Sequence, residues 1–237
     1  YVYWGTSSNS LKLGGIAADQ YLQKGSITFN QEINFQDAGY KVGDQIIITA
    51  TTSEPIKTGG KITVTLDSGG KAVLISNGTT TLTGTYTIES GEASSDLTVS
   101  SFALGSLGEA PTDAAGNVMS ATALPSGSNI ANSKDIVIDT TAPTATIATT
   151  DSVIRNDENL TVQSNEAGTA YLVKSTVADD AIDTEAKLLG LVGGNTVNQV
   201  TIGAGQETSD INLPLSGLID GDYKLITVDK AGNISAK

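Results

Sequence analysis

The sequence predicts an all-β chain that folds as two tandem β-sandwiches behind a short N-terminal arm. Composition is the first indication: charged residues make up 16% and aromatic residues 5% of the 237 positions, while Gly, Ser and Thr are plentiful. This mixture suits short strands joined by many turns better than long helices. Spacing is the second indication, because turn signals arrive roughly every ten residues, as in a β-sandwich. The length leaves room for two small domains.

The arm covers residues 1–25 and includes the stretch SSNSLKLGGIAADQYLQK. A Gly14-Gly15 pair interrupts it, and we expect a short helical turn over Ala17–Leu22. This piece is too short to bury a core alone, so it must pack against something else. Since the chain opens abruptly on YVYWGTSS, we also expect it to be a fragment of a longer protein.

The first sandwich is expected over residues 26–141 and the second over residues 142–237. In the first, the runs that predict strands are SITFNQEINF, QIIITATTS, KITVTLD, KAVLIS, TTLTGTYTIE, LTVSSFAL and KDIVID. In the second they are NLTVQSN, GTAYLVKS, TVNQVTIG, SDINLPLS and YKLITVDK. Between the second sandwich's strands, ADDAIDTEAKLLGLV carries apolar residues at loosely helical spacing (Ile182, Ala186, Leu189 and Leu191), which predicts a short inserted helix.

Three correspondences indicate that the two halves repeat one fold. TTSEP matches QSNEAG, VSSFAL followed by DAAGN matches LITVDKAGN, and both halves have a strongly apolar second strand. Arrays of such units are typical of elongated stalks.

Charge and the missing residue types exclude several functions. The 13 basic and 26 acidic residues give a formal net charge of −13, so neither nucleic acid nor an anionic membrane is an expected partner. The acidity serves either solubility or the neutralisation of bound cations. The chain has no Cys and no His, which excludes disulfides, a Cys or His zinc site, a thiol nucleophile and a His-based triad. Adjacent acids such as Asp179-Asp180 are expected to be solvated rather than catalytic, and we expect no enzymatic activity.

Several segments together resemble a known family. In order, YKVGDQIIITATTSEPI, TLDSGG, YTIESGEASSDLTV, DAAGN and DIVIDTTAP resemble the repeated immunoglobulin-like domains of very large bacterial adhesins and biofilm proteins. LIDGDYKLITVDKAGNIS is similar to the closing strands of the same superfamily. The resemblance covers residues 25–237 and implies two tandem immunoglobulin-like β-sandwiches that act as non-enzymatic spacers or adhesive modules, commonly rigidified by Ca²⁺. In the arm, SLKLGGIAADQYLQK is similar to segments of bacteriophage tail-fibre proteins.

In an immunoglobulin-like sandwich, the first strand starts at the same end as the loops that join strands B to C and F to G. SNEAG would be the B–C loop of the second domain, DKAGN its F–G loop, and the linker would enter beside them. We therefore expect Asp139, Glu166 and Asp229 to converge at the domain junction. Carboxylates brought together repel unless a cation lies among them, and Ca²⁺ prefers such oxygen ligands. Asn233 and backbone carbonyls near Thr141 or Lys230 could complete the shell.

The first domain offers a counterpart to this site. Glu54 in SEP and Asp113 in DAAGN are its candidate ligands, with Glu32 or Asp19 as the third. Structural alternatives remain open at both places: an Asp in a turn often bonds its own backbone, AGN can supply left-handed conformations, and Pro143 can stiffen the linker without an ion.

These observations leave alternative functions. The first is an extracellular structural or adhesive module, part of a Ca²⁺-rigidified surface adhesin or fibre on a bacterial surface. The second is a bacteriophage virion component, a tail fibre or decoration protein that mediates attachment to the host surface. The third is a carbohydrate-binding module. The expected partners are neighbouring domains or subunits of the same fibre, and a cell-surface glycan or protein receptor. Tyr1, Tyr3 and Trp4 could stack on sugar rings or anchor the arm against a neighbouring subunit, and the anchor is favoured.

Overall fold

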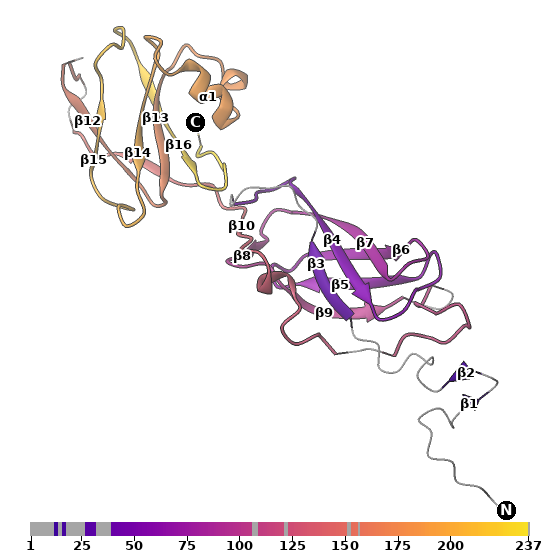
Figure 1. Cartoon of the computed structure of the whole chain (residues 1–237). Coiled ribbons are helices and arrows are strands. Elements are labelled where there is room, and N and C mark those ends of the chain that lie inside the picture. The colour runs from indigo at the N-terminus through magenta and orange to yellow at the C-terminus, as the bar shows by residue number, and fades with distance from the viewer. Residues whose placement is uncertain are drawn as a thin grey trace, which may run out of the picture. The chain divides into compact units, whose positions relative to one another are not determined.

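The computed structural model describes residues 12–13, 16–17, 27–31, 39–105, 109–120, 123–150, 153–155 and 157–236. The chain divides into two compact units: unit 1 comprises Tyr1–Asp37 and Gly43–Ile136, and unit 2 comprises Ala38–Val42 and Val137–Lys237. Strands dominate both units, which confirms the all-β fold class (Figure 1). The boundary falls before Val137 rather than after residue 141, and a short segment of the first half belongs to unit 2.

The main strands of unit 1 form one six-stranded antiparallel sheet in the order β3-β4-β7-β6-β5-β9. Its two halves, β3-β4-β7 and β6-β5-β9, are joined by the pairs Ile75–Thr83 and Ser76–Leu82 between β6 and β7. The bounds are β3 Ile27–Gln31, β4 Gln45–Thr52, β5 Lys61–Leu66, β6 Lys71–Ser76, β7 Thr81–Thr87, β8 Ala93–Ser94 and β9 Val99–Leu104. Buried positions alternate along β4, β5 and β6, as the period of a strand with one core face requires.

The segment after β9 completes unit 1. A 3-10 helix, η2 (Ile130–Asn132), follows the DAAGN loop and is capped by the side chain of Asn129. The predicted strand KDIVID is mostly wrong, since only its last two residues form a strand, β10 (Ile138–Asp139). Ile136 instead accepts a hydrogen bond from the backbone N–H of Leu97 at 2.9 Å and is 3% exposed.

Unit 2 repeats the strand order of unit 1. Its sheets are β11-β12-β15 and β14-β13-β16, both antiparallel, and each strand corresponds in order to one of unit 1. The bounds are β11 Ala145–Ile147, β12 Asn159–Ser164, β13 Gly168–Lys174, β14 Val197–Ile202, β15 Ile211–Pro214 and β16 Tyr223–Asp229. Aliphatic residues from both sheets meet between them in one core, including Leu160, Leu172 and Leu213.

A helical segment covers the second face of the β14-β13-β16 sheet. It comprises η3 (Asp179–Ala181) and α1 (Glu185–Leu191), which confirms the inserted helix. The expected apolar face was partly wrong: Leu188 is fully buried against the sheet, whereas Leu189 is 49% exposed. Because both faces of β13 are covered, four consecutive residues of that strand, Ala170–Val173, are buried.

In the arm, the described residues form a two-stranded pair, β1 (Lys12–Leu13) and β2 (Ile16–Ala17). The expected helical turn is therefore wrong at Ala17, and its remaining residues lie outside the described part. Within the described residues, no helix has the length and apolar character needed to span a bilayer.

Candidate metal centre

Strand pairing brings the loops after β12 and β16 to the same end of unit 2. β13 and β16 are antiparallel, with Gly168, the first residue of β13, opposite Asp229, the last residue of β16. Glu166 precedes Gly168 in the short loop after β12. The SNEAG and DKAGN loops therefore lie next to each other, although they are far apart in the sequence.

Gly168 permits this close approach. A Cβ atom at that position would lie 2.0 Å from the backbone oxygen of Val228 and 2.8 Å from the Cα of Asp229. No side chain fits in that space, so the chain requires glycine where the two loops meet.

Hydrogen bonds bring Asp139 to the same place from the segment ahead of β11. The backbone N–H of Asp139 donates to the backbone oxygen of Tyr40 at 2.9 Å. The backbone oxygen of Asp139 accepts a hydrogen bond from Nδ2 of Asn233 at 2.9 Å. The Oδ1 of Asp139 accepts the backbone N–H of Thr141 at 2.9 Å, which forms an Asx turn. The turn and the bond to Asn233 hold Asp139 against the DKAGN loop.

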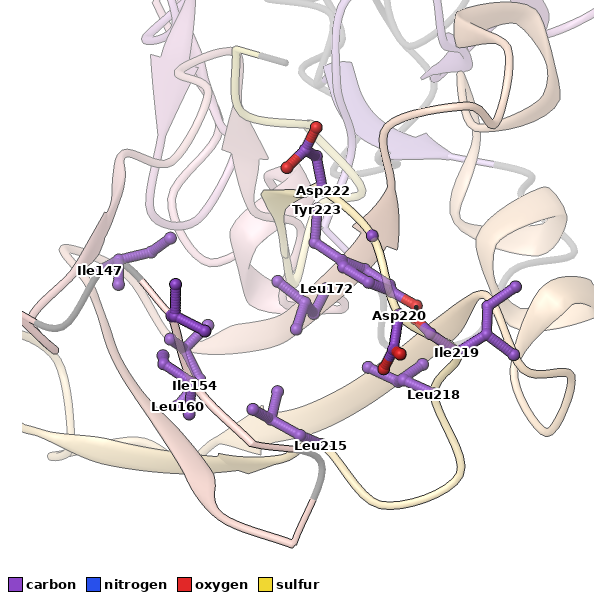
Figure 2. Close-up of a pocket in the computed structure, with 12 residues that line it drawn as sticks. Ile147, Ile154, Leu160, Leu172, Leu215, Leu218, Ile219, Asp220, Asp222 and Tyr223 are labelled. Carbon is purple, nitrogen blue, oxygen red and sulfur yellow. Dashed lines mark hydrogen bonds between the residues drawn. The ribbon is translucent and has the colours of Figure 1, made fainter.

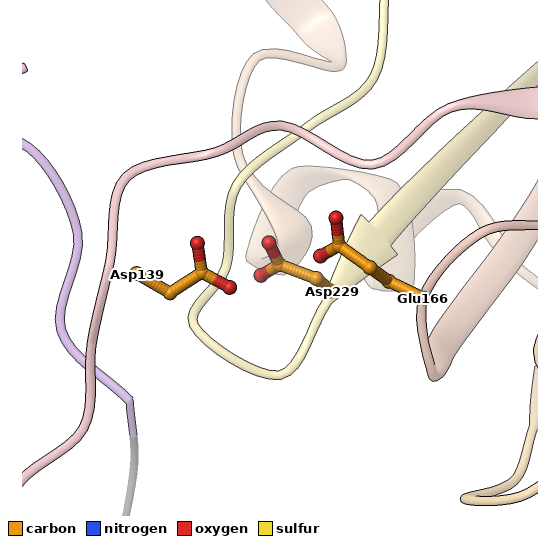
Figure 3. A group of neighbouring side chains, drawn as sticks. All are labelled: Asp139, Glu166 and Asp229. Carbon is orange, nitrogen blue, oxygen red and sulfur yellow. The ribbon is translucent and has the colours of Figure 1, made fainter. Parts of the chain in front are cut away.

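The result is a cluster of three carboxyl groups from three separate segments. One oxygen from each of Asp139, Glu166 and Asp229 lies within 4.8 Å of the others (Figure 3). Two oxygens bound to one Ca²⁺ at about 2.3–2.6 Å are at most about 5.2 Å apart, so the spread fits one coordination sphere. The convergence expected of these three acids is present, and the presence of an ion remains a prediction.

The DKAGN loop itself is held by its own side chains. Asp229 accepts the backbone N–H of Asn233 on Oδ1 at 2.9 Å and the amide Nδ2 of Asn233 on Oδ2 at 2.8 Å. Gly232 has a φ of 85°, a left-handed conformation that favours glycine. The carboxylate of Asp229 therefore bonds its own loop, and the loop uses a left-handed glycine, as the two structural alternatives stated. Each oxygen of Asp229 still keeps a lone pair that could bind a cation.

Asn233 positions the cluster and does not present a ligand oxygen to it. Its amide nitrogen donates to the carboxylate of Asp229 and to the backbone oxygen of Asp139. Both partners are acceptors, which fixes the amide with its nitrogen toward the cluster. In this structure Asn233 holds two of the candidate ligands together, and its own role as a ligand remains a prediction.

The negative charges of the three carboxylates repel one another, and this repulsion is visible in the pKa of Glu166. Burial raises the pKa of Glu166, and the negative charges of Asp139 and Asp229 raise it further. None of the three takes part in the ion pairs of the described residues. A cation does border the loop, because Nζ of Lys41 donates to the backbone oxygen of Gly232 at 3.0 Å. That bond uses one of the two lone pairs of the Gly232 carbonyl oxygen.

Unit 1 builds the same loop without an acidic cluster among its described residues. Asp113 accepts the backbone N–H of Asn117 at 2.8 Å and its Nδ2 at 2.7 Å, and Gly116 has a φ of 96°. Burial acts to raise the pKa of Asp113, but the side-chain bond from Asn117 and backbone N–H groups of the loop outweigh it and hold the pKa below its ordinary value. Asp113 is thus explained as the organiser of its own turn.

The other candidates of unit 1 form no group of three acids in the part of the chain that the structure describes. Glu54 lies in the loop after β4 at the place that Glu166 takes after β12. Glu32 and Asp19, the expected third ligands, lie outside the described residues. The ligand role of Glu54 and Asp113 therefore remains a prediction.

Sequence analysis missed two contributors to the cluster of unit 2. Asn165 accepts the backbone N–H of Thr144 on Oδ1 at 2.6 Å and donates from Nδ2 to Glu166 at 3.2 Å, so it links the entry to β11 with the acidic loop. Its position within SNEAG was the available signal. Lys41 lies 191 residues from Gly232, and no local pattern connects the two.

Comparison with protein-family models, with curated proteins and with solved structures finds no match for this chain. With neither His nor Cys in the chain, oxygen coordination is the metal chemistry open to these residues, and hard cations such as Ca²⁺ suit it.

Proposed function

We propose that the chain is a non-enzymatic structural module of an extracellular fibre or surface adhesin, and that unit 2 binds Ca²⁺ through Asp139, Glu166 and Asp229. The observation that carries this proposal is the spread of 4.8 Å among three carboxyl groups from three separate segments. The raised pKa of Glu166 supports it: burial raises this pKa most, the negative charges of Asp139 and Asp229 raise it further, and a divalent cation would relieve the repulsion among these charges.

The two units are proposed to be immunoglobulin-like sandwiches. Each has the order first–second–fifth strand in one half and fourth–third–sixth in the other, counting the six main strands of the unit. Related sandwiches place the first, second and fifth strands together and the third and sixth together, which supports this assignment.

The proposed role of the ion is mechanical. Asp139 belongs to the segment that leads into β11, whereas Glu166 and Asp229 belong to loops at the ends of β12 and β16. An ion bound to all three would fix that entry segment to unit 2. Pro143 lies between Asp139 and β11 and removes further backbone freedom. Together, the ion and Pro143 would stiffen the segment between Asp139 and β11, as a fibre that transmits load requires.

Isothermal titration of the full chain with Ca²⁺ tests the proposal. We expect one site with a Kd on the order of 10⁻⁴–10⁻³ M, the range of extracellular calcium modules. Mg²⁺ should bind much more weakly, because it demands compact octahedral geometry and gives up water reluctantly.

Asp139→Asn is the informative variant, since it keeps the shape of the side chain and removes one charge. Glu54→Gln, at the corresponding loop of unit 1, is the matched control for a carboxylate outside the cluster. Loss of Ca²⁺ binding in Asp139→Asn but not in Glu54→Gln is the expected result. A titration without measurable heat up to 10-fold above the stated Kd range would refute the calcium proposal.

A further inference from the structure

A second feature of unit 2 lies at the other end of its strands. A pocket of about 550 Å³ opens between the end of β11 and the start of β16 (Figure 2). Buried aliphatic side chains form its interior, among them Leu160, Leu172 and Leu218, and Tyr223 lines one wall. The volume lies in the range of about 300–1,000 Å³ that is typical of ligand sites.

The rim of this pocket combines apolar and acidic groups. Ile219 is 42% exposed and Val153 is 86% exposed, although both line the pocket. Asp220 and Asp222 lie on the same rim and are exposed. An occupant would therefore bury aliphatic surface and meet two carboxylates at the edge, beside the ammonium group of Lys174, which donates to the backbone oxygen of Asp220 at 2.8 Å.

In unit 1, a segment of the same chain covers the place between β3 and β9 that corresponds to the pocket of unit 2. β3 and β9 are the free edge strands of its two halves, as β11 and β16 are in unit 2. η2 contacts β3, and the side chain of Asn129 bonds both backbone groups of Val99, the first residue of β9, at 2.9 and 2.8 Å. The segment therefore bridges the two edges.

The apolar residues of that segment are buried. Ile130 is fully buried and Ile136 is 3% exposed, whereas Lys134 between them is exposed. Unit 1 thus closes its sandwich with isoleucine side chains on an irregular segment that is anchored by an asparagine and carries a lysine outside. In the described part of unit 2, the same position is the open pocket.

We propose that this pocket is a docking site for a polypeptide segment supplied in trans, with the chemistry that residues 129–136 have in unit 1. The segment would place an isoleucine or leucine side chain among Leu160, Leu172 and Leu218 and anchor its backbone at the edge of β16. A basic residue next to it would meet Asp220 and Asp222. The main apolar contribution is the burial of about one aliphatic side chain, and repetition along a fibre would strengthen the interaction.

A labelled peptide of residues 126–138, SGSNIANSKDIVI, tests the proposal by fluorescence anisotropy against the full chain. We expect saturable binding that weakens at least tenfold when the peptide carries Ile130→Asp. It should weaken equally when the chain carries Ile219→Asp. Because unit 1 already holds this segment in cis, loss of binding in Ile219→Asp assigns the site to unit 2.

Leu189→Asp is the matched control in the chain. Leu189 is exposed to a similar extent, 49%, but lies on α1, outside the pocket. This variant should bind the peptide as the wild type does, and circular dichroism of all variants should show equal folded signal.

Four results would overturn the proposal. The first is an absence of saturable binding, and the second is binding that Ile219→Asp leaves unchanged. The third is dimerisation of the wild type that Ile219→Asp abolishes while the peptide does not compete, which would assign the pocket to a second copy of the chain. An apolar dye that saturates the pocket and resists displacement by the peptide would likewise assign it to small ligands and overturn the inference.

Discussion

Glu166 and Glu54 occupy the same place in two copies of one loop, yet their surroundings differ. Each follows the last residue of the second strand by two positions, and each of these strands ends on a hydroxyl residue, Ser164 or Thr52. The Oγ of Ser164 accepts the backbone N–H of Glu166, whereas the Oγ1 of Thr52 donates to the backbone oxygen of Glu54. Only Glu166 faces two other carboxyl groups among the described residues. The residue type alone therefore does not define the site.

Replacing Glu166 by Gln should have opposite effects with and without calcium. In EDTA the variant should be more stable than the wild type by about 0.2–1 kcal/mol, the scale of an exposed charge interaction, because repulsion is removed. With Ca²⁺ at about 100 times its Kd the wild type should gain about 2.7 kcal/mol, and the variant much less. Urea unfolding measures both, and Glu54→Gln should show neither effect. Equal calcium responses in all three proteins would rule out a role for Glu166.

The raised pKa of Glu166 also gives the metal-free chain a defined pH dependence. Between the ordinary value of 4.5 and its raised folded value, the folded chain binds more protons at this residue than the unfolded chain does. The contribution of Glu166 to the free energy of unfolding is therefore lost as pH rises through that window. Comparing wild type with Glu166→Gln in EDTA isolates this term from other carboxylates. The stability difference between them should widen with rising pH and then level off, and a difference independent of pH would contradict the electrostatic account.

At the scale of elements, period and turn chemistry predicted most strands but not which helix face is buried. The runs QIIITATTS, KITVTLD and KAVLIS form strands because each alternates toward one core. α1 is short, and Leu188 and Leu189 are consecutive residues, so a small rotation of the helix about its axis determines which of the two is buried. Sequence spacing favoured Leu189, whereas packing on the β14-β13-β16 sheet buries Leu188. Tertiary contact decided what local periodicity could not.

Substitutions on α1 test this packing. Leu188→Ala should destabilise unit 2 by about 2–5 kcal/mol, because it removes buried methyl groups and leaves a cavity. Leu189→Ala, at an exposed position of the same helix, should change the free energy of unfolding by no more than about 0.5 kcal/mol. Both can be measured by urea unfolding. Similar losses for the two variants would mean that the helix packs through a different face.

The convergence of Asp139, Glu166 and Asp229 could be predicted because it follows from strand connectivity. The roles of Asn165, Asn233 and Lys41 could not, because they depend on amide orientation and on a contact across 191 residues. The D-x-A-G-N loop shows the same limit. Its sequence favoured a ligand at Asp229 and a structural turn at Asp113, and the structure shows the turn in both units.

Asparagine substitutions in the two copies of this loop separate those roles. Asn117→Ala and Asn233→Ala should each destabilise their own unit by about 1–3 kcal/mol, because a buried Asp loses a hydrogen-bond donor. Only Asn233→Ala should also weaken Ca²⁺ binding, since Asn233 additionally holds the backbone of Asp139. Calorimetric titration of both variants checks this, and equal calcium affinity in the two would assign Asn233 to the turn alone.

At the scale of the whole molecule, two separately packed units should unfold in two steps, and calcium should act on one of them. Unit 2 contains all three acids, so Ca²⁺ should raise only its transition, by on the order of 10 °C at about 100 times the Kd. Leu74→Ala in unit 1 and Leu188→Ala in unit 2 each remove a fully buried side chain, so each identifies its own transition in scanning calorimetry. The step lowered by Leu188→Ala should be the one that shifts with Ca²⁺ and returns with EDTA. If the step lowered by Leu74→Ala shifts as well, the first unit also holds an ion, and if neither shifts, the acidic cluster contributes only charge.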